Sequence, residues 1–129
     1  MKCTKEQERK HLHYIENRER IRAQQRQYYY EHHDELLTRQ RIYSRRRDKE
    51  LKIKALKYYG EGRTQCVVCS ESRLACLSID HINGGGGKQR KVIGHHIYWW
   101  LNKHNYPEGY QTLCMNCQWV KRDQRKEGN

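Results

Sequence analysis

The sequence Leu77-Ser-Ile-Asp-His-Ile82 lies in the second half of the chain, between two Cys-x-x-Cys pairs. Apolar residues alternate at Leu77 and Ile79, which predicts a short, half-buried strand. Asp80 and His81 stand at the end of that strand, where side chains leave the sheet. A carboxylate beside an imidazole can hold a hard cation and can also take a proton from water. We therefore expect the rest of the chain to position this pair.

The two Cys-x-x-Cys pairs flank this stretch and are separated by 44 residues. Each pair puts two sulfurs on one tight turn, and two such turns brought together form a tetrahedral set that suits zinc. The predicted ligands are Cys66, Cys69, Cys114 and Cys117. We expect a closed structural site whose binding energy becomes folding energy, with disulfides or a redox pair as the alternatives. The two other cysteines, Cys3 and Cys76, are interpreted as plain thiols.

Composition limits the core and indicates the partner. Only 35% of the 129 residues are hydrophobic and 33% are charged, so a large core is not expected. The net charge of +12 favours a polyanionic partner, nucleic acid first and an anionic membrane surface second. The sequence shows no apolar signal segment near Met1 and no stretch near the roughly 18 apolar residues of a membrane span. These features predict a cytoplasmic protein that does not enter a membrane.

Residues 1–60 contain no proline, no glycine before Gly60, and mostly helix-forming side chains. An aliphatic residue and a tyrosine each recur every 15 residues, at Ile21, Leu36 and Leu51 and at Tyr28, Tyr43 and Tyr58. Within a repeat the two are seven residues apart, which puts them on one helical face. We expect a long helical arm, with breaks near Asn17, His33 and Arg47.

This arm carries most of the excess charge, with 17 Lys and Arg against 9 Asp and Glu. One interpretation is a solvated helical face whose tyrosines pack on a partner helix. The other is an arm that contacts phosphates and contributes affinity more than specificity. The arginines expected to do so are Arg26, Arg41, Arg45, Arg46 and Arg47.

Gly60 and Gly62 end the arm, so the sequence predicts a domain boundary between residues 60 and 61. The predicted domain, 61–129, contains four consecutive glycines, 84–87, which let a nucleic-acid backbone approach closely. A helix is expected over 92–105, a second strand over 110–113 and a final helix from the second cysteine pair. The cations expected to meet phosphates in this domain are Lys88, Arg90, Lys91, Lys121 and Arg122. The predicted fold class is α+β, a small zinc-stabilised domain preceded by a basic helical arm.

The ordered set of motifs resembles the HNH, or His-Me finger, endonucleases with a ββα-metal core. The shared features are a Cys-x-x-Cys pair, a strand ending in Asp-His, a strand entering a second Cys-x-x-Cys pair, and a helix beginning there. Over residues 63–125 the chain is most similar to the zinc-containing phage type of the recombination endonuclease VII kind. The resemblance implies a phage protein that acts in the bacterial host cell on DNA. The basic arm lies outside the resemblance.

The resemblance implies that Asp80 binds a catalytic Mg²⁺ or Mn²⁺ and that His81 is the general base. The family completes the metal site with Asn or His directly after the last zinc cysteine, where this chain has Gln118. The glutamine can act as a ligand after local adjustment, Asn116 or Asn83 can replace it, or the chain can bind DNA and cut poorly. The implied activity is hydrolysis of DNA phosphodiester bonds, by nicking or by double-strand cutting.

Cutting both strands needs a second site, so a homodimer is one option, and the arm is a candidate for forming it. Two alternatives stay open. The chain can be a zinc-stabilised nucleic-acid-binding protein with weak or no nuclease activity, because Gln118 departs from the family pattern. It can also be a structural helical protein that assembles through the arm.

Overall fold

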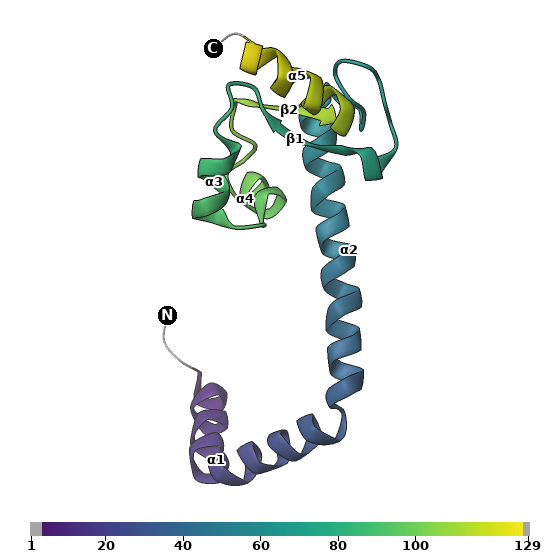
Figure 1. Ribbon diagram of the computed structural model, residues 1–129. Coiled ribbons are helices and arrows are strands. Elements are labelled where there is room, and N and C mark those ends of the chain that lie inside the picture. Colours follow the sequence, from purple (N-terminus) through teal and green to yellow (C-terminus); the bar gives the residue numbers. More distant parts are fainter. Residues whose placement is uncertain (1–3, 128–129) are drawn as a thin grey trace. The chain divides into compact units, whose positions relative to one another are not determined.

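The computed structural model describes residues 4–127, so Cys3 lies outside the described residues. It confirms the expected α+β class, because the chain is mostly helical with one two-stranded sheet (Figure 1). The elements in order are α1 (Lys5–Glu31), α2 (His33–Tyr59), a 3-10 turn (Leu74–Cys76), β1 (Leu77–His81), α3 (Gly86–Ile93), α4 (Ile97–Lys103), β2 (Tyr110–Cys114) and α5 (Met115–Glu127). The chain divides into two compact units, Met1–Tyr43 and Ser44–Asn129, and this division falls within α2.

The first unit is helical and has no buried side chain among its described residues, 4–43. α1 begins at a capping box, in which the Thr4 hydroxyl accepts from the Gln7 N–H at 3.3 Å and the Gln7 side chain accepts from the Thr4 N–H at 2.8 Å. The predicted break near His33 is confirmed, since α1 ends at Glu31 and α2 begins at His33. The break expected near Asn17 is wrong, because that side chain donates to the His13 carbonyl at 2.9 Å and the helix continues.

α2 also continues through Arg47, so the break expected there is wrong as well. The 15-residue repeat is visible in the exposure of its members. The aliphatic positions, Ile21, Leu36 and Leu51, are half-buried. The tyrosine positions, Tyr28, Tyr43 and Tyr58, are exposed.

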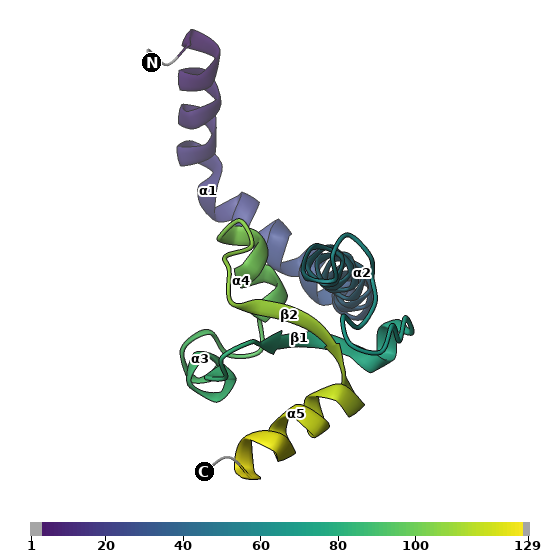
Figure 2. The same cartoon turned by 90° about the horizontal axis from the view of Figure 1, so that it is seen from above.

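Both predicted strands are present in the second unit, and β1 pairs with β2 in antiparallel register. Asp80 lies opposite Gln111, and His81 lies opposite Tyr110. Because side chains alternate along a strand, Asp80 faces one side of the sheet and His81 the other. Figure 2 shows the sheet between α5 on one side and α2 and α4 on the other. Asp80 contacts Lys121 of α5, whereas His81 contacts Gln89 of α3.

The last turns of α2 supply part of the second unit's core. Ala55 and Leu56 are fully buried, and Leu56 packs in one cluster with Leu77 and Leu113. The buried Thr112 hydroxyl donates to the Leu56 carbonyl at 2.8 Å, so α2 is hydrogen-bonded to β2 as well as packed against it. Stability of the sheet thus depends on a helix whose composition is otherwise that of a solvated arm.

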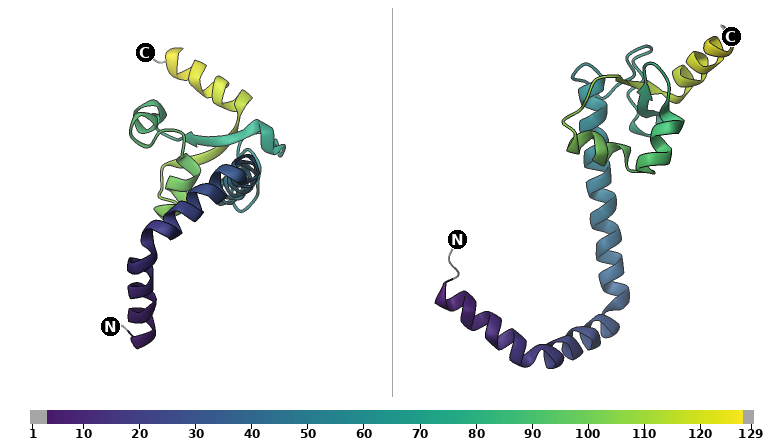
Figure 3. Two further views of the ribbon diagram at one scale, coloured as in Figure 1. Left: turned by 90° about the horizontal axis from the view of Figure 1, so that it is seen from below. Right: turned by 90° about the vertical axis from the view of Figure 1, so that its left-hand side faces the viewer.

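The helix expected over 92–105 is wrong in its bounds. Gly84 and Gly85 have φ of 78° and 90°, and α3 begins directly after them, at Gly86. α3 ends at Ile93, the next residue Gly94 has a φ of 65° that suits glycine, and α4 follows at Ile97. Figure 3 shows α3 and α4 as two separate helices beside one end of the strand pair. The glycine run therefore turns the chain and starts a helix.

Tyr59 connects the end of α2 to the segment before β2. Its hydroxyl donates to the Pro107 carbonyl at 2.5 Å, and burial raises the pKa of Tyr59 well above its ordinary value of 10. The Tyr59→Phe variant should lose about 1 kcal/mol of unfolding free energy at pH 7. The Tyr59 hydroxyl ionises more readily in the unfolded chain than in the folded one. The wild type should therefore also lose unfolding free energy as the pH rises above 10, and Tyr59→Phe should lack this pH-dependent loss.

The measurement is urea unfolding of zinc-saturated protein, followed by circular dichroism, at pH 7, 10 and 11. Tyr58→Phe is the matched control, because Tyr58 is 58% exposed. Identical pH dependence in Tyr59→Phe and Tyr58→Phe would contradict the assignment.

Candidate functional site: a four-cysteine cluster and a basic cleft

The two Cys-x-x-Cys pairs come together in the second unit. The sulfurs of Cys66, Cys69, Cys114 and Cys117 all lie within 4.8 Å of one another. Tetrahedral zinc with Zn–S bonds near 2.3 Å separates its sulfurs by about 3.8 Å, so the cluster has the size that zinc needs. None of the four sulfurs is in a disulfide. The cluster could therefore hold a structural metal ion such as zinc, with four protein ligands and no open position.

Backbone hydrogen bonds shape the first pair of the cluster. The Cys66 N–H donates to the Glu71 carbonyl at 2.8 Å, and the Ser70 N–H donates to the Cys66 carbonyl at 3.0 Å. The Val67 N–H donates to the Thr112 carbonyl at 3.0 Å, which ties this turn to β2. The second pair lies where β2 ends and α5 begins. The cluster thus joins the sheet, α5 and the loop after α2.

The thiols of the cluster differ in acidity. Burial raises the pKa of the Cys66 thiol, but N–H groups of Cys69, Cys114 and Val68 directed at its sulfur outweigh burial and lower it to about 6. Burial and the three neighbouring sulfurs raise the pKa of Cys117. One thiolate forms readily and the next is opposed by it, so the cluster favours a cation at its centre.

A cleft of about 770 Å³ lies at the end of the strand pair, between the glycine turn and α5. It is lined by Asp80, His81 and Gln118, the three residues expected to form the site. Five cations also line it, namely Arg90, Lys121, Arg122, Arg125 and Lys126. The cleft therefore suits an anion.

Asp80 is held by two donors from different elements. The Lys121 ammonium on α5 forms an ion pair with Oδ2 of Asp80 and donates to the His81 carbonyl at 2.7 Å. The Gln111 amide donates to the same Oδ2 at 2.8 Å. Both members of the ion pair are largely shielded, with side chains 22% exposed for Lys121 and 16% for Asp80. The other carboxylate oxygen, Oδ1, has no hydrogen-bond partner among the described residues.

His81 is oriented by a chain of two hydrogen bonds. Its Nε2 is bonded to the side-chain oxygen Oε1 of Gln89, and the side-chain nitrogen Nε2 of Gln89 donates to the Tyr110 hydroxyl at 2.6 Å. An amide oxygen only accepts, so Nε2 carries the hydrogen and Nδ1 of the neutral ring keeps a lone pair. A Cβ on Gly86 would lie 2.9 Å from Nδ1, so a larger residue at position 86 would crowd that nitrogen. His81 is therefore prepared to accept a proton at Nδ1.

The Gln118 amide is anchored through its nitrogen. Nε2 donates to the Ser78 hydroxyl at 2.5 Å and to the Leu113 carbonyl at 3.3 Å. Its oxygen has no hydrogen-bond partner among the described residues, and the side chain lines the cleft. Gln118 thus presents an oxygen to the same space as Asp80.

The oxygens of Asp80 and Gln118 are the ligand type that Mg²⁺ and Mn²⁺ take. The donor set fits such an ion in kind, but the cation already next to the carboxylate is the Lys121 ammonium. Within residues 4–127 the cysteine cluster is the only group of three or more His, Cys, Asp or Glu that could hold a metal. A divalent ion would therefore depend on one carboxylate, one amide and water.

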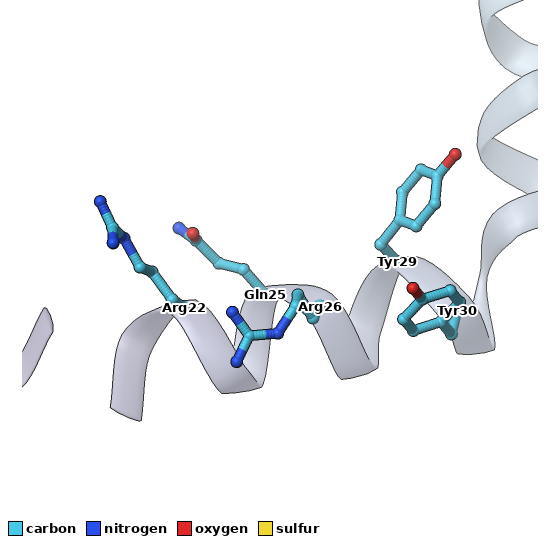
Figure 4. Close-up of a pocket in the computed structure, with 5 residues that line it drawn as sticks. All are labelled: Arg22, Gln25, Arg26, Tyr29 and Tyr30. Atoms are coloured by element: carbon cyan, nitrogen blue, oxygen red, sulfur yellow. The ribbon is translucent and has the colours of Figure 1, made fainter. Parts of the chain in front are cut away.

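The other predicted phosphate contacts lie on three helices. Arg90 lines the cleft, whereas Lys88 and Lys91 are exposed on α3 without lining it. Arg26 lines a separate surface pocket of about 280 Å³ on α1, with Arg22, Gln25, Tyr29 and Tyr30 (Figure 4). The remaining arginines are exposed on α2 and comprise Arg41, Arg45, Arg46 and Arg47.

Sequence reasoning missed several residues of the site. Gln111 could have been found from the register of the two predicted strands, because it lies opposite Asp80. No pattern in the sequence points to Gln89, because the helix predicted over 92–105 begins after it. Arg125, which donates to the Ile82 carbonyl at 2.5 Å, lies beyond the part of the final helix that was singled out.

No family model matches this chain, and neither does any curated protein or solved structure. None of the helices within residues 4–127 is long and apolar enough to cross a membrane. The features that bear on function are therefore the cysteine cluster and the basic cleft.

Proposed function

We propose that the chain is an HNH-type endonuclease with a ββα-metal core that hydrolyses DNA phosphodiester bonds. The observation that carries the proposal is the cleft, in which Asp80, His81 and Gln118 are brought together with five cations. The order of β1, β2 and α5 also agrees with the ββα arrangement that the resemblance implies.

In this mechanism the cations of the cleft hold the DNA backbone with one phosphate beside His81. Nδ1 of His81 takes a proton from a water molecule, whose oxygen bonds to phosphorus while the bond to the 3′ oxygen breaks. The leaving oxygen takes a proton from solvent, which gives 5′-phosphate and 3′-hydroxyl ends. Asp80 and Gln118 would hold Mg²⁺ or Mn²⁺, which supplies charge that stabilises the leaving oxygen.

The helices before the cleft have a proposed role in the same activity. The exposed arginines of α1 and α2 contact phosphates along the duplex, and the tyrosines among them pack on the DNA backbone or on a second copy of the chain. The boundary between an arm of residues 1–60 and a nuclease domain of residues 61–129 stays a prediction. Assembly as a homodimer and action inside a phage-infected cell stay predictions as well.

A second function, zinc-stabilised nucleic-acid binding without cutting, is favoured by one observation. The carboxylate that would hold the catalytic cation is already paired with Lys121. In that case the cleft binds phosphate and no bond is broken.

A supercoiled-plasmid nicking assay distinguishes the two functions. The wild type is compared with His81→Ala and Gln118→Asn, with and without added Mg²⁺ or Mn²⁺. We expect metal-dependent nicking that falls by about 10²–10⁴-fold in His81→Ala, because the general base is lost. His104→Ala is the matched control, since His104 is an exposed histidine at the end of α4, outside the cleft.

Faster cutting by Gln118→Asn would mean that the glutamine is a strained ligand. If only Gln118→Asn cuts, the natural chain is a disarmed nuclease. If no variant cuts while all of them shift DNA in a gel, the binding function replaces the nuclease.

A further inference from the structure

Lys121 occupies an unusual position for a residue that binds DNA. Its ammonium has three N–H groups, of which one is bonded to Asp80 and one to the His81 carbonyl. The third is left for the cleft, which Lys121 lines. The same group can therefore neutralise the carboxylate and receive a phosphate oxygen.

The ammonium opposes a divalent ion at Asp80. Two positive charges next to one carboxylate repel each other, and the partial burial of this pair weakens the screening of that repulsion by water. The affinity of Oδ1 for a cation is therefore low as long as no second negative charge lies beside the Lys121 ammonium. A phosphodiester that accepts from Lys121 supplies the missing negative charge.

We propose that Lys121 couples metal binding at Asp80 to phosphodiester binding in the cleft. Without DNA, Lys121 pairs with Asp80 and metal affinity is low. With DNA, the ammonium pairs with the phosphate and Asp80 becomes available to the metal. Linkage requires the reverse effect as well, so the metal tightens DNA binding by the same factor. The inference rests on the proposed function, and it deepens it by assigning the regulation of the same site.

The test is Mn²⁺ titration of the zinc-loaded full chain, in which free Mn²⁺ is measured by electron paramagnetic resonance. It is done with and without a short DNA duplex in a His81→Ala background, which prevents cutting and keeps the backbone carbonyl that Lys121 uses. We expect the duplex to tighten Mn²⁺ binding by at least about tenfold. Lys121→Met should bind Mn²⁺ at least about tenfold more tightly without DNA, and the effect of the duplex should shrink.

Lys103→Met is the matched control, because it removes the same charge from an exposed lysine at the end of α4, which does not line the cleft. It should leave Mn²⁺ affinity without DNA within about twofold of the parent, because the ion pair of Asp80 is with Lys121. Asp80→Asn should abolish the site. The coupling is refuted if Lys121→Met and Lys103→Met bind Mn²⁺ equally, if Asp80→Asn still binds it, or if no variant binds it.

Mn²⁺ binding and plasmid nicking separate the two proposals. Coupled binding without nicking would leave the regulation intact and remove the nuclease. Nicking together with an Mn²⁺ affinity that changes neither with DNA nor with Lys121→Met would leave the nuclease intact and remove the coupling.

Discussion

Removal of zinc is expected to unfold the second unit. The four thiols of the cluster join β2, α5 and the turn at Cys66, while the hydrophobic core beside them is small. Zinc binding contributes about 10–16 kcal/mol in small structural sites, which exceeds the net stability of most domains. Exhaustive chelation should therefore cost more than about 5 kcal/mol and abolish the cooperative thermal transition, measured by near-UV circular dichroism alongside zinc content.

Single substitutions provide the control for this result. Cys117→Ser removes one ligand and should release most of the zinc at micromolar protein. Cys76→Ser should change stability by less than about 1 kcal/mol, because Cys76 is a half-buried thiol outside the cluster. Zinc-free protein that melts at the same temperature as the zinc-loaded form would show that the cluster has no structural role.

Leu56→Ala should be the most destabilising single change in α2. Leu56 is fully buried against the strand pair, where it packs with Leu77 of β1 and Leu113 of β2. Its truncation leaves a cavity that the sheet, pinned by the cysteine cluster, cannot collapse to fill. The expected loss is roughly 2–5 kcal/mol in urea unfolding of zinc-saturated protein.

Leu12→Ala provides the comparison, because it is the same change at a side chain that is 58% exposed in α1. Its expected effect is within about 0.5 kcal/mol. Similar losses of unfolding free energy for the two variants would mean that Leu56 of α2 does not belong to the core of the second unit.

Local patterns in the sequence were sufficient for the strands and the cysteine cluster. Alternation at Leu77 and Ile79 predicted β1, and Cys-x-x-Cys spacing predicted two turns that bring sulfurs together. These signals depend on residues within a few positions of one another, so they survive without knowledge of the fold. The position of Asp80 and His81 at the end of a strand followed from the same pattern.

The two ends of α3 were harder to predict. Four glycines normally disfavour a helix, yet α3 begins inside the run because Gly84 and Gly85 take positive φ and direct the chain into it. The break at Gly94 then follows from its own positive φ. The helix predicted over 92–105 spans that break, because apolar spacing alone carries no information about backbone dihedral angles.

The sequence by itself determined the elements that build the site: a strand ending in Asp80 and His81, two cysteine pairs and a basic final helix. Tertiary structure decided which side chains contact the site. Lys121 lies 41 residues from Asp80, and Gln89 reaches His81 from a separate helix. Such contacts depend on how α3 and α5 pack against the sheet, and that packing reflects burial and hydrogen bonding over the whole unit. No local pattern encodes it, so the partner of Asp80 became visible only in the fold.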